Sequence, residues 1–271
     1  MKIASIFIFL SLRCKLSYRG GNMKKNKKIL CSVFLTFAAT LFAQTSKFSI
    51  EQIMNSYDKN KLYETGRMSA KIEVKDKFGT TYNYFESFAK RNGDTLITVT
   101  EGPDAGQKIL RLKDSVYLFY PDAEEVIRLQ GSALKDSIMG SDFTYEDLTG
   151  DNSILNNYSG ELIAEETIDG IECYHVMLTA KNRKQLYQKQ ELWLDKKTYA
   201  TVKEIDYSAS GKALNESRFY DIKNFDGHWI SVKSVTKNLL KKNSETTMYI
   251  SSVEIDKPIA EKLFSVSELS Y

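Results

Sequence analysis

The chain has 271 residues, of which 42% are hydrophobic and 12% aromatic, and it contains only three prolines. This composition excludes a disordered polymer and predicts a globular protein with a substantial core. The formal net charge of +3 is unevenly distributed, because residues 1–43 hold eight Lys or Arg and no Asp or Glu. The remainder has 30 basic and 35 acidic side chains, a net charge of about −5, so we expect no nucleic-acid partner.

Residues 23–43 have the features of a secretory signal peptide. A basic run from Lys24 to Lys28 precedes the apolar stretch from Ile29 to Ala43, as export signals require. We expect cleavage after Ala43 and interpret residues 1–22 as an over-extended start, which leaves open whether Met1 or Met23 is the initiator. The sequence therefore predicts a targeting region over 1–43, a single domain over 44–271 and a periplasmic location.

The cysteines argue against a lipid anchor and against a disulfide. An anchor needs a cysteine directly after the apolar stretch, where Gln44 stands, so we expect release as a soluble protein. Only Cys173 follows the targeting region. Cys173 and His175 would share one strand face, but they lie in no recognised zinc or nucleophile pattern. We interpret both as structural and expect no metal, no cofactor and no catalytic residue.

An amphipathic helix is predicted near the start of the domain. Apolar residues recur with helical spacing between Phe48 and Tyr57. Ser49 is a candidate N-cap, with Gln52 three residues later. The sequence leaves open whether this helix packs against a core or plugs a cavity.

The pattern then changes to the alternation that is typical of strands, beginning with Met68 to Val74. Turn residues such as Asn92-Gly93 and Asp169-Gly170 separate the later segments. We expect strands at 68–75, 81–90, 95–100, 108–112, 115–120, 125–129, 160–167, 171–180, 187–194, 200–208, 213–225, 229–238 and 245–255, with an edge segment near Phe264. Their close spacing predicts an antiparallel meander rather than βαβ units.

Residues 131–157 interrupt this rhythm with glycines and a polar-aromatic centre, which predicts a loop and a short helix. Asp142 and Glu146 would share one side of that helix and could form an acid-base pair. A structural role is the simpler interpretation, with Asp142 as N-cap of a helix over 143–148.

These elements predict a mainly β protein with few helices (α+β), in which a curled antiparallel sheet forms an open half-barrel wrapped over helices. Curling hides strand edges and creates a concave apolar face. A cavity between that face and the helices is a natural lipid site.

Several segments together resemble the outer-membrane lipoprotein-sorting family, the LolA-like carrier superfamily. The most specific is Gly140-Ser141-Asp142-Phe143-Thr144-Tyr145-Glu146-Asp147-Leu148. The others are Tyr120-Pro121, residues 125–128, the segment 187–195 with Trp193, the hairpin with Asp206-Tyr207 and Gly211-Lys212, and the C-terminal Leu263, Phe264 and Leu269. The resemblance covers roughly residues 66–271.

The resemblance implies a non-enzymatic periplasmic carrier that binds acyl chains of lipoproteins or lipids and moves them toward the outer membrane. Its partners would be an inner-membrane exporter and an outer-membrane acceptor, and we expect a monomer. The alternative is a lipid-sensing or adaptor protein for an envelope regulator or exporter; a lipid hydrolase is a weaker third. The candidate cavity residues are Met68, Ala70, Ile72, Val74, Tyr84, Leu118, Tyr120, Phe143, Tyr145, Leu148 and Trp193.

Overall fold

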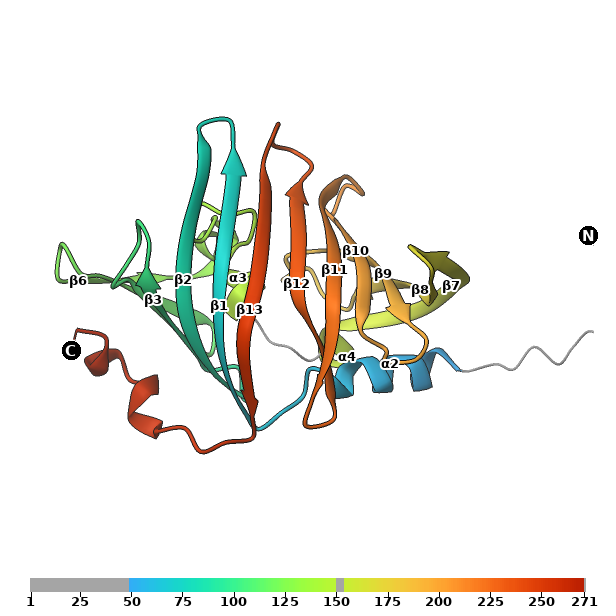
Figure 1. Ribbon diagram of the computed structural model, residues 1–271, viewed down its shortest axis with the longest axis horizontal. Helices are drawn as coiled ribbons and strands as arrows, with labels where there is room; N and C mark the ends of the chain where they lie inside the picture. Colours follow the sequence, from blue (N-terminus) through green and yellow to red (C-terminus); the bar gives the residue numbers. More distant parts are fainter. Residues whose placement is uncertain (1–48, 150–153, 271) are drawn as a thin grey trace, which may run out of the picture. The chain divides into compact units, whose positions relative to one another are not determined.

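A computed structural model describes residues 49–149 and 154–270, all within one compact unit, Phe48–Tyr271. Thirteen antiparallel strands form one curled sheet in the order β6-β5-β4-β3-β2-β1-β13-β12-β11-β10-β9-β8-β7 (Figure 1). The two edges, β6 and β7, do not pair with each other, so the sheet stays open. The predicted open half-barrel is confirmed.

The observed strands agree closely with the predicted ranges, and several begin and end at the predicted residues. Their bounds are β1 (Thr65–Asp76), β2 (Gly79–Lys90), β3 (Thr95–Glu101), β4 (Lys108–Leu112), β5 (Ser115–Tyr120), β6 (Glu125–Leu129), β7 (Tyr158–Ile168), β8 (Ile171–Ala180), β9 (Lys189–Asp195), β10 (Thr201–Tyr207), β11 (Ala213–Phe225), β12 (His228–Asn238) and β13 (Glu245–Ile255).

The helices of the described residues are few and short. They are α2 (Ile50–Lys59), α3 (Tyr145–Thr149) and α4 (Ile154–Asn157), with 3-10 turns η1 (Gly131–Lys135), η2 (Glu261–Phe264) and η3 (Val266–Glu268). The predicted edge strand near Phe264 is wrong, because η2 and η3 occupy that region. Phe264 and Leu269 pack instead against Leu110 on the outer face of β3 to β5. Within the described ranges, none of the helices has the length and apolarity needed to cross a membrane.

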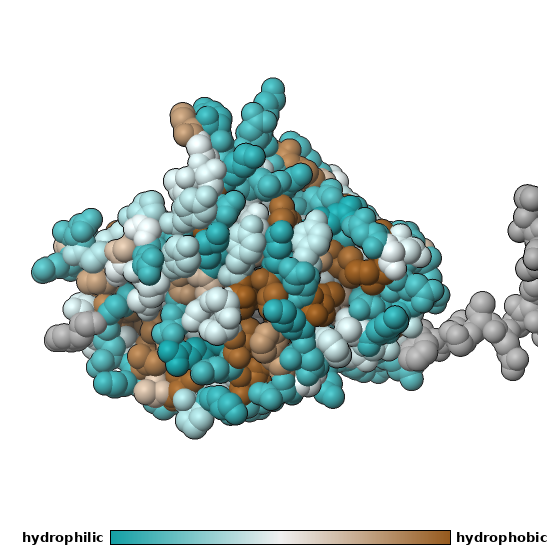
Figure 2. Space-filling view, viewed as in Figure 1, coloured by the Kyte–Doolittle hydropathy of each residue, from teal (hydrophilic) through white to brown (hydrophobic). Residues whose placement is uncertain are grey.

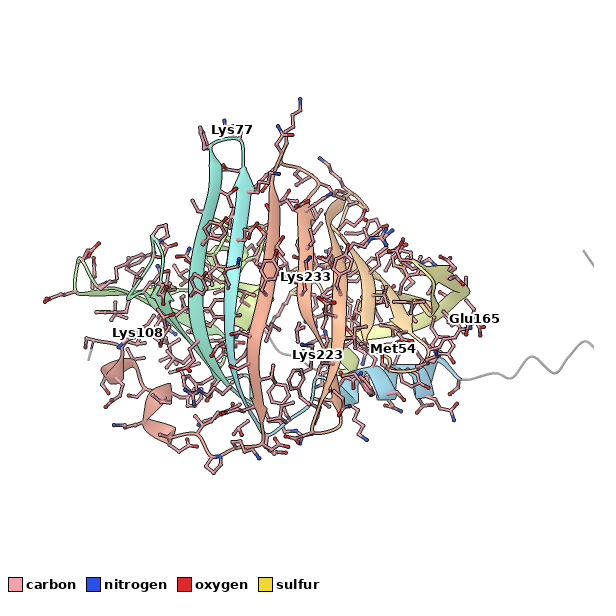
Figure 3. The ribbon with its side chains drawn as sticks, in the orientation of Figure 1. Met54, Lys77, Lys108, Glu165, Lys223 and Lys233 are labelled. Carbon is pink, nitrogen blue, oxygen red and sulfur yellow. The ribbon has the colours of Figure 1, made fainter. Side chains whose placement is uncertain are left out.

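The predicted helix at the start of the domain is α2, and its capping box is confirmed. The Ser49 hydroxyl accepts a hydrogen bond from the Gln52 amide, and the Gln52 side chain accepts one from the Ser49 amide. Ile53, Met54 and Tyr57 are buried against the inner face of β7 to β9, where Figure 3 labels Met54. Because these three side chains are at most 2% exposed, α2 is a core-packing helix.

The inner face of the sheet carries two separate apolar clusters. One lies under α2 on β7 to β9. The other lies on β1 to β5 and is covered by residues 131–149, which we call the covering segment. Three buried side chains of the covering segment, Leu134, Ile138 and Tyr145, close over Ile72 and Val116 of the sheet. The middle of the inner face, from β10 to β12, belongs to neither cluster.

The outer face of the sheet is more polar. α3 lies behind β1 and β13 in Figure 1, so that view shows their outer face. Hydrophilic residues dominate this surface in Figure 2. On it the Lys233 ammonium, labelled in Figure 3, lies 5.6 Å from the Tyr220 ring centre and 5.7 Å from that of Tyr249. Lysine stems and tyrosine rings thus shield the outer side of the strands while their polar ends meet water.

Candidate functional site

The motif that carries the family resemblance shapes the covering segment. Met139 and Gly140 both have positive φ angles, 51° and 65°, which turn the chain back toward the sheet. The Ser141 hydroxyl donates to the Ile138 carbonyl at 2.7 Å and accepts from the Phe143 amide at 3.1 Å. This turn places Ile138 and Met139 on the apolar inner face, where both are buried.

Three carboxylates fasten the covering segment, two of them to strands or their ends and one to the loop between β8 and β9. Asp142 accepts hydrogen bonds from Ser244 at 2.5 Å and Thr246 at 3.2 Å, both on or beside β13. Glu146 pairs with Arg111 of β4, N to O distance 2.9 Å, and the Arg111 side chain is only 10% exposed. In the third contact, the Tyr187 hydroxyl donates to Asp147 at 2.9 Å. The acid-base interpretation therefore gains no support, because Asp142 and Glu146 have separate partners.

The predicted N-cap Asp142 is wrong, since Thr144 caps α3. The Thr144 hydroxyl accepts from the Asp147 amide at 3.1 Å, and the Asp147 carboxylate accepts from the Thr144 amide at 2.8 Å. This reciprocal pair begins the helix at Tyr145, two residues later than predicted. Asp142 is thereby free to bind the sheet.

A cleft of about 870 Å³ opens between the covering segment, α4, residues 183–187 and the middle of the inner face. Ligand cavities of proteins typically measure about 300 to 1,000 Å³. The apolar part of its lining consists of Leu134, Phe143, Leu148, Ile154, Tyr158, Leu186 and Phe219. The cleft is thus large enough for a ligand and apolar along several of its walls.

Polar side chains of β9 to β12 line the other part of the cleft. We call this set, Gln190, Glu204, Asp206, Asn215, Ser217 and Thr236, the polar stripe. The Gln190 amide nitrogen donates to Glu204 at 2.7 Å and to Asp206 at 2.8 Å. Across the next strands, the Ser217 and Thr236 hydroxyls lie 2.8 Å apart. The stripe separates the two apolar clusters of the inner face.

Three carboxyl groups at the cleft, those of Asp147, Glu204 and Asp206, have raised pKa values. Burial, followed by the nearby Glu204 charge, raises the pKa of Asp206 well above its ordinary value. Burial also raises the pKa of Glu204, against an opposing effect of Lys61. Asp147 is exposed within the cleft, where the surrounding protein replaces much of its water. This desolvation raises the pKa of Asp147 to about 6. Protonation of these acids is therefore favoured over that of exposed carboxyls.

The structure brings most of the candidate cavity residues together. Met68, Ala70, Ile72, Val74, Leu118, Tyr120, Phe143, Tyr145 and Leu148 all belong to the cluster beneath the covering segment or pack against it. Of these nine, Phe143 and Leu148 also line the cleft. Tyr84 and Trp193 lie apart from it: Tyr84 is 43% exposed, and Trp193 packs with Cys173 and Val202 in another cluster.

Ala70 tests how tightly the covered cluster is filled. It is 3% exposed and packs beneath the covering segment. Replacing Ala70 by Phe should lower the free energy of unfolding by about 1 to 3 kcal/mol, because neighbours already fill the space. Thermal melting of lipid-free protein measures this, with Thr80→Phe at an exposed position of β2 as control. If both variants melt at the same temperature, the space beneath the covering segment is not fully packed.

Cys173 and His175 share the outer face of β8, as predicted, away from the cleft. Cys173 is fully buried, and burial raises the pKa of its thiol to about 11. The His175 ring stacks on Trp193 at 4.2 Å and lies between Glu166 and Glu191, at 3.0 and 3.2 Å. Across the described ranges, no group of three or more His, Cys, Asp or Glu residues has a metal-binding arrangement.

Replacing Cys173 by Ser is expected to lower the free energy of unfolding by about 1 to 3 kcal/mol, because a hydroxyl is costlier to bury than a thiol. Binding of a fluorescent fatty acid should stay within a few-fold of wild type. Denaturant titration and probe titration measure the two effects separately. A folded variant that no longer binds the probe would assign the thiol a functional role.

The polar stripe is the part of the site that the sequence did not predict. Glu204 and Asp206 alternate with Lys203 and Ile205 on β10, so neither face of that strand has a clear apolar pattern. A carboxylate pair on a strand is ordinarily assigned to the solvent side. The available signal was the lack of a clear apolar face on β10, in contrast to strands such as β1.

Solved structures share this fold across nearly their whole length. One is a DUF1329 family protein from Desulfovibrio piger, with a TM-score of 0.74, 22% identity and coverage of 80% of this chain and 96% of that one. An outer membrane lipoprotein-sorting protein domain from Vibrio parahaemolyticus matches with a TM-score of 0.72 and 19% identity, over 81% and 97%. A LolA superfamily protein from Nitrosomonas europaea matches with a TM-score of 0.68 and 21% identity, over 80% and 98%.

These likenesses define the fold as LolA-like and confirm the resemblance predicted from the sequence. The chain belongs to the family whose model, described as "-like: Uncharacterized protein", matches residues 91–271. None of the curated proteins compared with the chain matches it.

Proposed function

We propose that the protein is a non-enzymatic carrier that binds the acyl chains of lipoproteins or other lipids at the inner face of its sheet. The observation that carries this proposal is the cleft of about 870 Å³, which continues from an apolar face closed by the covering segment. Phe143 and Leu148 belong to both. An acyl chain entering along them would meet the same surface that Ile138 and Tyr145 cover.

Binding and release would depend on competition between the acyl chain and the covering segment. Each buried methylene contributes about 0.8 kcal/mol, so an acyl chain in an open apolar groove would be held too tightly to pass on. The segment offsets part of this gain, because its own apolar side chains must leave the sheet before cargo enters. Its three carboxylate contacts are polar, so when the segment leaves the sheet these groups can hydrogen-bond to water instead.

The proposed setting is the periplasm, with residues 1–43 as a cleaved targeting region and 44–271 as the carrier domain. Two similar structures, a lipoprotein-sorting domain and a LolA superfamily protein, support lipoprotein cargo. Under this proposal the carrier receives cargo from an inner-membrane exporter and delivers it to an outer-membrane acceptor. Native mass spectrometry of protein recovered from the periplasm would identify the bound lipid. The same spectrum would give the mass of the chain and so test where it is cleaved.

A pair of neighbouring residues tests whether the cleft holds the acyl chain. Phe219 lines the cleft from β11, whereas Tyr220 lies on the opposite face and is 42% exposed. Phe219→Asp should weaken binding of a fluorescent fatty acid at least about ten-fold, because a charge in the acyl path is costly to desolvate. Tyr220→Asp should leave binding unchanged. Equal binding by both folded variants would refute the cleft as the acyl site.

A further inference from the structure

The polar stripe has more hydrogen-bond acceptors than donors. Gln190 has two amide hydrogens, and both are used, one on Glu204 and one on Asp206. Each of those carboxylates has a second oxygen, for which Gln190 has no further hydrogen. Asp147, the third acid at the cleft, already accepts from Tyr187 and Thr144. When Glu204 and Asp206 are both ionised, one primary amide with two donors cannot satisfy their oxygens.

The Asn215 side chain shows the same deficit independently. The Tyr187 hydroxyl gives its single proton to Asp147 and must accept from its other neighbour, the Asn215 amide nitrogen at 2.9 Å. This fixes the Asn215 amide group, whose oxygen has no hydrogen-bond partner although the residue lines the cleft and is only 6% exposed. Buried acceptors are nearly always paired in folded proteins. The orphaned oxygen therefore marks the place of a missing donor.

We propose that the polar stripe binds the ammonium headgroup of an aminophospholipid whose acyl chains follow the apolar walls of the cleft. This inference rests on the proposed function and names its cargo class. A primary ammonium brings one positive charge and three N–H donors, which fits an acceptor-rich group. Lys61 also lines the cleft, and its charge favours the ionised form of Glu204. The exposed side chains of Arg183 and Lys184 line the same cleft and suit the adjoining phosphate.

The charged and titratable groups that face the cleft set a pH dependence for this site. They are Lys61, Arg111, Asp114, Lys135, Glu146, Asp147, Tyr158, Arg183, Lys184, Tyr187, Glu204 and Asp206. Lipid amines stay protonated at neutral pH, whereas Asp147, Glu204 and Asp206 must lose protons to pair with one. Affinity for an amine lipid should therefore rise with pH as these acids ionise, relative to a lipid without an amine.

The experiment compares soluble short-chain lipids that differ only in their headgroup. Dihexanoyl phosphatidylethanolamine and dihexanoyl phosphatidylglycerol each displace a fluorescent fatty acid from wild type, from Glu204→Gln/Asp206→Asn and from the outer-face control Glu216→Gln. We expect wild type and control to prefer the ethanolamine lipid about ten-fold, and the double variant to bind both lipids equally. Asp206→Asn alone serves if the double variant does not fold. Free phosphoethanolamine separates headgroup binding from lipid binding.

The outcomes separate this inference from the proposed function. Equal displacement by the two lipids in wild type, or a preference that survives in the double variant, would overturn the ammonium site while leaving acyl binding intact. Displacement by free phosphoethanolamine as strong as that by its lipid would overturn the lipid assignment. If neither lipid displaces the probe, the carrier proposal itself fails.

Discussion

Replacing Ile138 by Ala is expected to raise affinity for a fluorescent fatty acid at least about ten-fold while destabilising the protein. Ile138 is fully buried on the covering segment, against the inner-face cluster. Truncating a buried isoleucine costs about 2 to 5 kcal/mol. The substitution destabilises the arrangement in which the covering segment is closed on the sheet, so an acyl chain displaces the segment more easily. A destabilisation of about 1.4 kcal/mol already corresponds to ten-fold in affinity.

Leu110→Ala is the matched control for this variant. Leu110 is equally buried, but it lies on the outer face of β4 and packs under the C-terminal segment. Its truncation should cost a similar free energy of unfolding without any gain in affinity. Probe titration and denaturant titration of both variants decide the matter. If Ile138→Ala stays folded and binds the probe more weakly than wild type, the covering segment is a wall of the site rather than a competitor.

Replacing Asp206 by Asn is expected to stabilise the protein at pH 8 by about 1 to 3 kcal/mol, and by less at pH 4.5. Asp206 is 5% exposed, and burial and Glu204 raise its pKa. The folded chain therefore holds this proton at pH values where the unfolded chain has released it. The corresponding stability is present at low pH and is lost as the pH rises through the folded pKa. Asn keeps the shape and needs no proton.

Denaturant titrations at several pH values measure this effect as the difference between wild type and variant. Asp122→Asn, an exposed position in the turn after β5, is the control and should change neither the stability nor its pH dependence. Glu204 interacts with Asp206, so the measured difference includes the change that the substitution causes in Glu204. A variant that is less stable than wild type at pH 8 would show that the Asp206 charge is stabilising.

The strands and α2 could be predicted because each depends on local pattern. Alternation along β1 places Ala70, Ile72 and Val74 on one face, and that face is buried. The C-terminal segment misled the prediction, since Phe264 and Leu269 are apolar whether they join a sheet edge or cover its outer face. Only tertiary packing distinguishes these cases, and here they pack on Leu110.

The site was harder to predict because its residues come from distant parts of the chain. Phe143 and Leu148 were found through the family motif, and they line the cleft. Tyr84 was proposed for its aromatic ring, but Phe85, its neighbour on β2, takes the inner face. The polar stripe joins residues of four strands. That Glu204 and Asp206 face the inside of the sheet depends on how these strands pack together, which the local sequence does not show.

The order of the strands constrains how this sheet assembles. Neighbouring strands are consecutive in the chain everywhere except at the centre, where β1 pairs with β13 and Gly66 lies opposite Ile255. The flanking meanders can each form from contacts of low sequence separation, which is fast. Joining β1 to β13 closes a loop that contains nearly the whole domain, at a high cost in chain entropy. We therefore expect the pairing of β1 with β13 to limit the folding rate. Before it forms, the two half-sheets would be intermediates with exposed edges that are prone to aggregate.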